Sequence, residues 1–204
     1  MVFLIDKEGA GGTGHMGMLF QDETGAWNYF TQGAAENGSF SGFVSGSNYS
    51  GGVGIMPMQT VTKSGEVINM TKEQALAFVQ SGGADGTKYD NSITLKTTQE
   101  QDGIITSNAY SLQNEFKTNN EEYNVYTNNC TDAVQDVVEG TKAIETGISL
   151  PNDTDPRPNE YFEKLQTSVP VLNGELILMT IPSTMDNVPA KQFVVPNIQQ
   201  TPGQ

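Results

Sequence analysis

The stretch YNVYTNNCTDAV, residues 123–134, passes from an extended pattern into a helical one. Its first residues are aromatic and aliphatic, as is typical of an extended segment. From Ala133 onward the apolar residues recur at the spacing of an amphipathic helix. Asn128 and Asn129 are both good helix N-caps, so we expect Cys130 to lie in the first helical turn. This cysteine is the only one in the chain.

A cysteine at a helix start ionises more easily than an ordinary thiol. Unpaired N–H groups and the helix dipole favour a negatively charged sulfur, and the thiolate is the reactive form. The backbone N–H of Cys130 is also a candidate for half of an oxyanion hole, beside the predicted cap residue Asn129. Asp132 in the same turn stabilises the helix but opposes thiolate formation, so we expect its carboxylate to point into solvent.

His15 is the only histidine, and therefore the only imidazole that can act as a base for Cys130. It begins the segment HMGMLF, residues 15–20, which is followed by the segment AWNYF, residues 26–30. Together these segments predict a β-hairpin with a four-residue turn, residues 22–25. A side chain at the open end of such a hairpin can project at the rim of a sheet.

A third polar group is expected to hold the imidazole in one tautomer. With a four-residue turn, His15 falls opposite Gln32, and directly opposed residues share a face of the sheet. Gln32, and after it Asn28, are therefore the predicted orienting residues. A one-residue error in the turn would bring Thr31 or Tyr29 to this face instead.

The composition excludes several classes of function. The formal net charge is −14, from 10 Lys and Arg against 24 Asp and Glu. A field of this sign repels phosphate backbones and anionic lipid, so we predict no nucleic-acid partner. No window approaches the roughly 18 apolar residues of a membrane span. One cysteine and one histidine allow no internal disulfide and no structural zinc, so we predict no metal site.

The sequence GAGGTG, residues 9–14, formally matches the G-x-G-x-x-G motif. A dinucleotide-binding loop must lead into a helix whose N-terminus meets the pyrophosphate. Here the predicted hairpin follows instead, so we predict no cofactor. The glycines are expected to form a mobile or closely approached loop before His15.

The remaining patterns predict an α+β fold in which helices pack on an antiparallel sheet. We expect strands near residues 2–5, 53–61, 66–70, 92–97 and 175–181, and helices near residues 72–80, 98–117, 130–139 and 159–166. Residues 33–52 are rich in Gly, Ser and Asn and read as a long surface excursion. We predict one domain, residues 1–181, and an extended, partly disordered tail, residues 182–204.

The segments GHMGMLF (residues 14–20), WNYF (27–30) and YNVYTNNC (123–130) resemble the circularly permuted NlpC/P60 group of the papain-like superfamily. In that group a histidine on an early strand precedes a cysteine in an Asn-Cys motif at a helix start. The resemblance implies a papain-like fold, with Cys130 as the nucleophile and His15 as the base. It also implies acyl transfer on peptide or peptidoglycan-peptide amides, a cysteine peptidase or amidase activity.

The same group contains lecithin:retinol acyltransferase-like enzymes, which place a second histidine on the second strand. This chain has no second histidine, which favours a hydrolase supported by Gln or Asn. Two alternatives remain open: a thiol acyltransferase or lipid esterase on the same fold, and a non-catalytic interaction domain that keeps an idle thiol.

Residues 2–9 and 156–162 extend the resemblance to the C-terminal domains that follow RHS repeats in bacterial polymorphic toxins. The chain also enters a predicted strand at once, as expected of a domain cut from a longer chain. This resemblance spans roughly residues 1–166. It implies a secreted effector, delivered into a target cell as part of a larger bacterial protein, with a cognate immunity protein as a partner.

Overall fold

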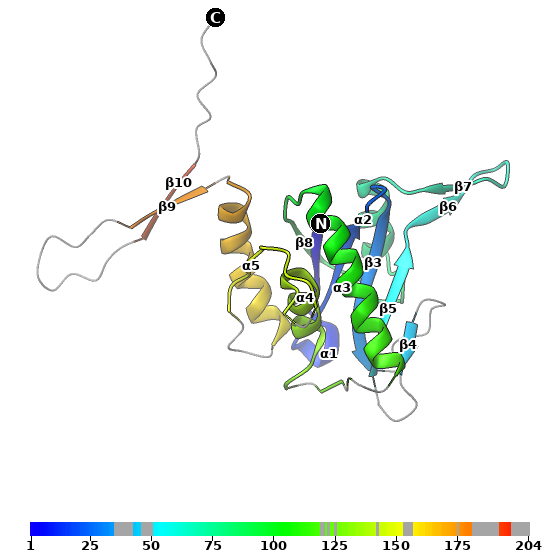
Figure 1. Ribbon diagram of the computed structural model, residues 1–204, viewed down its shortest axis with the longest axis horizontal. Coiled ribbons are helices and arrows are strands. Elements are labelled where there is room, and N and C mark those ends of the chain that lie inside the picture. Colours follow the sequence, from blue (N-terminus) through cyan, green and yellow to red (C-terminus); the bar gives the residue numbers. More distant parts are fainter. Residues whose placement is uncertain are drawn as a thin grey trace, which may run out of the picture.

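The computed structural model describes residues 1–34, 43–45, 51–118, 121, 123–124, 126–141, 143–152, 157–174, 176–180 and 192–196. It is an α+β fold built on one antiparallel sheet, with strand order β4-β5-β3-β2-β1-β8 (Figure 1). The strands of this sheet are β1 (Val2–Asp6), β2 (His15–Gln21), β3 (Trp27–Ala34), β4 (Phe43–Ser45), β5 (Gly51–Pro57) and β8 (Asn91–Thr94).

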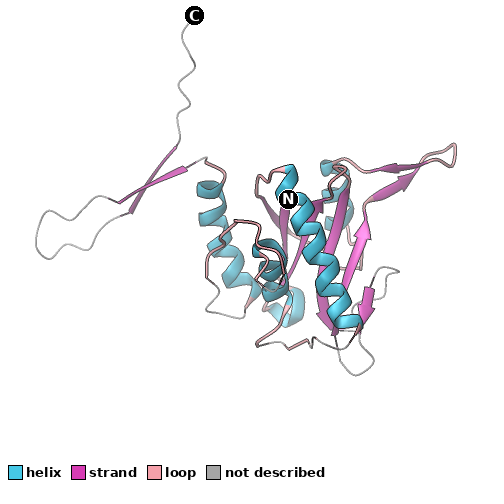
Figure 2. Ribbon diagram, in the orientation of Figure 1, coloured by secondary structure: helices cyan, strands magenta, loops and turns pink. Residues whose placement is uncertain are grey.

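The helices and two small ribbons complete the described part of the chain (Figure 2). The helices are α1 (Gly9–Gly12), α2 (Lys72–Gln80), α3 (Gln99–Lys117), α4 (Cys130–Glu139) and α5 (Pro158–Leu172). The ribbons pair β6 (Gln59–Val61) with β7 (Val67–Asn69), and β9 (Leu176–Thr180) with β10 (Gln192–Pro196).

Hydrophobic clusters cover both faces of the sheet, because alternate side chains of a strand point to opposite faces. Phe3 and Ile5 of β1 belong to a cluster that includes residues of α3, α4 and α5. Val2 and Leu4 belong to a second cluster, which includes residues of α2. These four of the five β1 residues are fully buried, so β1 is an interior strand enclosed between two layers of helix.

Three of the described helices begin with capping boxes. Thr71 caps α2, Thr98 caps α3 and Asn129 caps α4, each with a reciprocal side-chain contact from the third helical residue. The predicted helices near residues 72–80, 98–117 and 130–139 are therefore confirmed almost to the residue. The predicted helix near 159–166 exists but is longer, since α5 continues to Leu172.

Two predictions about the less regular parts of the chain are modified. Within the predicted excursion of residues 33–52, residues 33–34, 43–45 and 51–52 belong to strands of the main sheet, and the rest lies outside the described residues. The predicted strand near 175–181 is present as β9. Its partner β10 lies within the predicted tail, residues 182–204, whose other residues lie outside the described part.

Candidate active site

The register between β2 and β3 decides which side chains face His15. Gly17 pairs with Thr31 and Gln21 with Trp27, so residues 22–26 form a five-residue connection. The predicted four-residue turn is therefore wrong by one residue. Asp22 accounts for the extra residue, because its side chain accepts the N–H groups of Thr24 and Ala26 and widens the turn.

This shift changes the residue that orients the imidazole. Thr31 shares the face of His15, and its Oγ1 lies 2.9 Å from Nε2 of His15. The predicted orienting residues, Gln32 and Asn28, point to the opposite face. Gln32 donates instead to Asn128 Oδ1 at 3.4 Å, and Asn28 donates to the carbonyl of Ala26. A register error of one residue was the physical reason for the wrong assignment.

The sulfur of Cys130 lies where β2 separates from β3. Pairing with β3 stops at Gly17, whereas pairing with β1 continues to His15, which lies opposite Asp6. The N–H of Met16 is therefore not paired with β3 and instead donates to Sγ of Cys130 at 3.4 Å. Cys130 belongs to the cluster on the helical face, whereas His15 shares the opposite face with Thr31, so the sulfur meets this strand end beside the imidazole.

The start of α4 matches the predicted helix cap. The side chain of Asn129 accepts the N–H of Thr131, and the carboxylate of Asp132 accepts the N–H of Asn129 at 2.8 Å. Asp132 stabilises the helix start as expected, since it completes the capping box, and its side chain is half-buried. Cys130 occupies the first helical position, with its sulfur at the positive end of the helix.

Cys130 and His15 shift each other's protonation. Burial alone would raise the pKa of the Cys130 thiol, but the charge of His15 and a side-chain hydrogen bond to it lower that pKa overall. Burial alone would lower the pKa of His15, but the Cys130 sulfur outweighs this effect and raises that pKa. The Met16 N–H further favours the thiolate. Since Nε2 faces Thr31, Nδ1 is the nitrogen left for the sulfur. The arrangement favours a thiolate–imidazolium pair.

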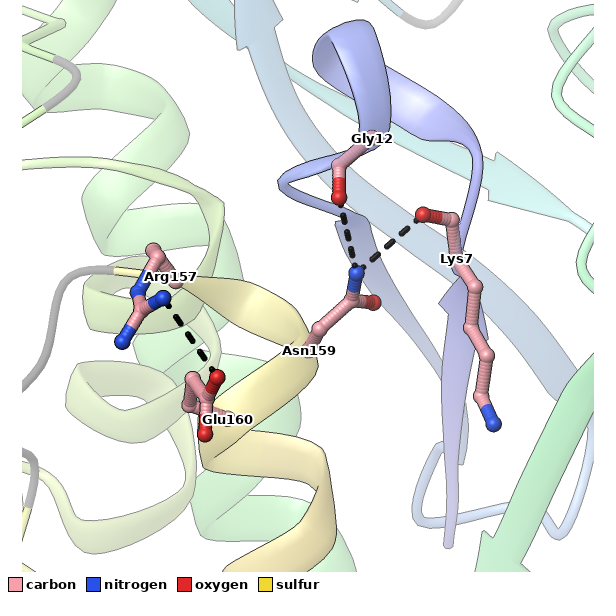
Figure 3. A network of polar contacts seen from close by, with 5 residues as sticks. All are labelled: Lys7, Gly12, Arg157, Asn159 and Glu160. Atoms are coloured by element: carbon pink, nitrogen blue, oxygen red, sulfur yellow. Dashed lines mark hydrogen bonds and ion pairs between the residues drawn. The ribbon is translucent and has the colours of Figure 1, made fainter.

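The loop before His15 is held by a residue far along the chain, Asn159 at the start of α5. Its Nδ2 donates to the carbonyls of Lys7 and Gly12, each at 3.1 Å (Figure 3). Gly14 has a φ of 96°, and a Cβ there would lie 2.4 Å from Oδ1 of Asn159. The expected close approach of this glycine-rich loop is therefore confirmed.

Three residues near His15 were not identified from the sequence. The ring of Tyr89 lies 6.1 Å from that of His15, centroid to centroid, and the charges of Asp85 and Asp6 both favour the imidazolium. Tyr89 and Asp85 lie in the connection between α2 and β8, where no hydrophobic period marks individual positions.

Among the described residues, no group of three or more His, Cys, Asp or Glu side chains is arranged to hold a metal ion. Within the same residues, no helix is both long and apolar enough to cross a bilayer. Comparison with known proteins gave no matching family model, and neither a curated protein nor a solved structure matches the chain significantly. The case for function therefore depends on the geometry of the site.

Proposed function

We propose that the chain is a cysteine-dependent hydrolase, a peptidase or amidase that acts by acyl transfer on peptide or peptidoglycan-peptide amides. The observation that carries the proposal is the position of Cys130 at the start of a capped helix, with its sulfur accepting the N–H of Met16, the residue directly after His15. His15 lowers the pKa of the thiol, which favours the nucleophilic thiolate, and the Cys130 sulfur raises the pKa of the imidazole, which favours the acid form of His15.

In this reaction the thiolate of Cys130 attacks the carbonyl carbon of an amide and forms a C–S bond. The charge that develops on the carbonyl oxygen is stabilised by the start of α4, where the Cys130 N–H is the nearest donor candidate. The His15 imidazolium then protonates the leaving nitrogen as the C–N bond breaks. A water molecule, deprotonated by His15, attacks the thioester, and the acid and the free thiolate–imidazolium pair result.

A papain-like arrangement, in the permuted order of the NlpC/P60 group, is part of the same proposal. It is supported by the order of the chain, with His15 on an early strand and Cys130 at a later helix start, and by the antiparallel sheet. The setting that we propose is a bacterial toxin domain of the RHS-associated kind, secreted or delivered into a target cell as part of a larger protein. A cognate immunity protein would then bind and inhibit it.

One observation favours a second candidate, a non-catalytic interaction domain. Cys130 is only 4% exposed, so a substrate can reach the sulfur only if neighbouring groups move. A buried lone cysteine often acts simply as a small apolar residue. The pKa of such a thiol is raised by burial, however, whereas here the pKa is lowered by His15.

The test is turnover by the purified chain, with Cys130→Ala and His15→Ala as paired controls. The substrates are peptidoglycan stem peptides, unstructured protein, and acyl esters with a chromogenic leaving group. Cleavage of an amide that both variants abolish supports the proposal. Turnover of acyl esters alone would indicate the acyltransferase or esterase alternative. No turnover of any class, with iodoacetamide labelling no faster than that of a peptide thiol at pH 6, would indicate the interaction domain.

A further inference from the structure

A row of hydroxyl groups leads away from His15 on the face of the sheet that α2 covers. Tyr29 Oη donates to Asp85 Oδ2 at 2.8 Å, and the hydroxyls of Tyr29 and Tyr89 are 2.6 Å apart. Tyr29 and Tyr89 are buried, and both belong to the cluster on this face. Burial raises the pKa of each phenol well above its ordinary value, so both keep their protons at neutral pH.

The row is continuous with the imidazole through Thr31. The Thr31 hydroxyl is 2.9 Å from Nε2 of His15. It also lies near both phenol hydroxyls, since it lowers the pKa of Tyr89 and of Tyr29. The position of the Tyr89 hydroxyl agrees with this, because a Cβ on Gly17 would lie 2.5 Å from it. Gly17 is directly opposite Thr31 in the β2–β3 register, so the Tyr89 hydroxyl lies over this pair.

The carboxylate at the far end fixes the direction of every proton in the row. An ionised carboxylate only accepts, so Tyr29 must donate to Asp85. Tyr29 then has no proton left for Tyr89, and Tyr89 must donate to Tyr29. By the same reasoning the Thr31 hydroxyl donates to one of the two phenol oxygens, and the remaining donor needed by Thr31 is the Nε2–H of His15. Nδ1 is thereby left with a lone pair toward Cys130.

We propose that Asp85, acting through Tyr29, Tyr89 and Thr31, is a positioning residue that fixes His15 in the Nε2–H tautomer. In this tautomer Nδ1 is the base for the thiol. The proposal deepens the function proposed above and rests on it for its catalytic meaning. The proposal adds a carboxylate to the site, although this carboxylate does not contact the imidazole directly. A search for a third residue beside His15 would therefore not find Asp85.

The structure also predicts what an amide at position 85 would do. Asp85 Oδ1 accepts the N–H of Thr87 at 2.9 Å. In Asp85→Asn the amide oxygen keeps this contact, so the NH₂ group must point at Tyr29. Tyr29 would then accept rather than donate, and the row would reverse as far as Thr31. The Thr31 hydroxyl would donate to Nε2, and the proton of His15 would move to Nδ1, where it blocks the base.

Because His15 is the only histidine, its tautomer can be read directly by NMR of protein labelled with ¹⁵N in histidine. The measurement uses a Cys130→Ala background, in which no thiolate holds the imidazole in its charged form. At a pH where the ring is neutral, we expect Nε2–H as the major form. With Asp85→Asn added, Nδ1–H is expected to become the major form. With Tyr89→Phe added, which removes one hydroxyl of the row, the two forms are expected to approach the ratio found for histidine in an unstructured peptide.

Two matched controls separate the effect of the hydroxyl row on the tautomer from the general effect of removing a charge or a hydroxyl group. Asp6→Asn removes the other carboxylate that favours the imidazolium, while Tyr110→Phe removes an exposed hydroxyl on α3. Both are expected to leave the tautomer ratio unchanged. The proposal is overturned if Asp85→Asn and Tyr89→Phe, shown to be folded by circular dichroism, leave the ratio as in the background, or if Asp6→Asn shifts it equally.

The tautomer measurement involves no reaction, so it fails or succeeds independently of the proposed function. In the chain with Cys130 intact, Asp85→Asn is also expected to slow iodoacetamide labelling at pH 7 by about tenfold, the effect of losing one buried hydrogen bond at the base. A shifted tautomer without any amide turnover by the wild-type chain would support the positioning role of Asp85 and contradict the proposed hydrolase activity. Amide turnover with an unshifted tautomer would support the hydrolase activity and contradict the positioning role of Asp85.

Discussion

Met16 donates its backbone N–H to the sulfur of Cys130, 3.4 Å away. Met16 directly follows His15, so one strand end positions both the base and the nucleophile. The contact exists because pairing of β2 with β3 begins only at Gly17, so the N–H of Met16 has no partner in that ladder. The geometry of the pair therefore depends on the backbone of β2 as much as on the two side chains.

The pH dependence of thiol labelling tests the pair itself. The pKa of Cys130 is lowered by His15, so the midpoint of its iodoacetamide labelling curve is expected below the ordinary thiol value of 9.0. In His15→Ala the burial of the sulfur remains and the cation is lost. The labelling curve should then move to a pH above that of a free thiol. Identical curves for the two proteins would contradict the pairing of Cys130 with His15.

Thr31 is expected to support His15 through its hydroxyl. Thr31→Val keeps the shape of the side chain but removes the contact with Nε2, so labelling of Cys130 at pH 7 should fall about tenfold. Thr31→Ser keeps the hydroxyl oxygen, so its labelling rate should fall much less. If the two variants lose the same amount, the methyl group rather than the hydroxyl is the important part of Thr31.

Gly17 is expected to resist substitution for a steric reason. A Cβ there would lie 2.5 Å from the Tyr89 hydroxyl and 3.0 Å from the Phe30 carbonyl. Gly17→Ala should therefore lower the free energy of unfolding by about 1–3 kcal/mol in urea titrations. Gly103→Ala is the matched control, because no atom lies within 4 Å of a Cβ there and α3 should gain up to about 1 kcal/mol. Equal effects of the two changes would contradict the close approach of Tyr89.

Asn159 is expected to stabilise the loop before His15 (Figure 3). Asn159→Ala leaves the carbonyls of Lys7 and Gly12 without this donor and should cost about 1–3 kcal/mol of unfolding free energy. Its neighbour Glu160 pairs with Arg157 at 3.5 Å, with side chains 45% and 55% exposed. Glu160→Ala should therefore change stability by less than about 1 kcal/mol. If Glu160→Ala lowered the free energy of unfolding more than Asn159→Ala, the loop would be held by other contacts.

The amino terminus is expected to make stability depend on pH. The Met1 ammonium donates to the Leu95 carbonyl at 2.9 Å, and burial lowers its pKa from 8.0 to about 6. Between these values the unfolded chain binds a proton that the folded chain does not. The free energy of unfolding should therefore rise by about 2–3 kcal/mol from pH 6 to pH 8 through this group. An Nα-acetylated chain should lack this component; an unchanged pH profile after acetylation would contradict the assignment.

The helices and the cysteine position could be predicted because their signals are local. Capping residues such as Thr98 and Asn129 lie beside the groups that they satisfy, and hydrophobic periods mark the buried faces. Thr31 could be named only as the alternative to Gln32, because the choice depended on the exact length of one turn. A single extra residue at Asp22 exchanged Gln32 for Thr31 at the imidazole.

The partners beyond Thr31 were harder still to predict. Asp85 and Tyr29 are far apart in the sequence and meet only because the connection after α2 packs on the sheet. No spacing rule links a residue of a loop to one face of a distant strand. Asn159 reaches Lys7 across an even longer separation, for the same reason.

The bare Cα of Gly17 has a consequence for finding other chains built in the same way. Room for the Tyr89 hydroxyl exists only if the second residue after the histidine has no side chain. A relative that uses the same hydroxyl row should therefore carry the signature His-x-Gly on its first hairpin strand, a threonine on the second, and an Asp-x-x-x-Tyr spacing in a later loop. This pattern can be searched for without any overall similarity of sequence, and a match that carries alanine in place of the glycine should lack the tyrosine as well.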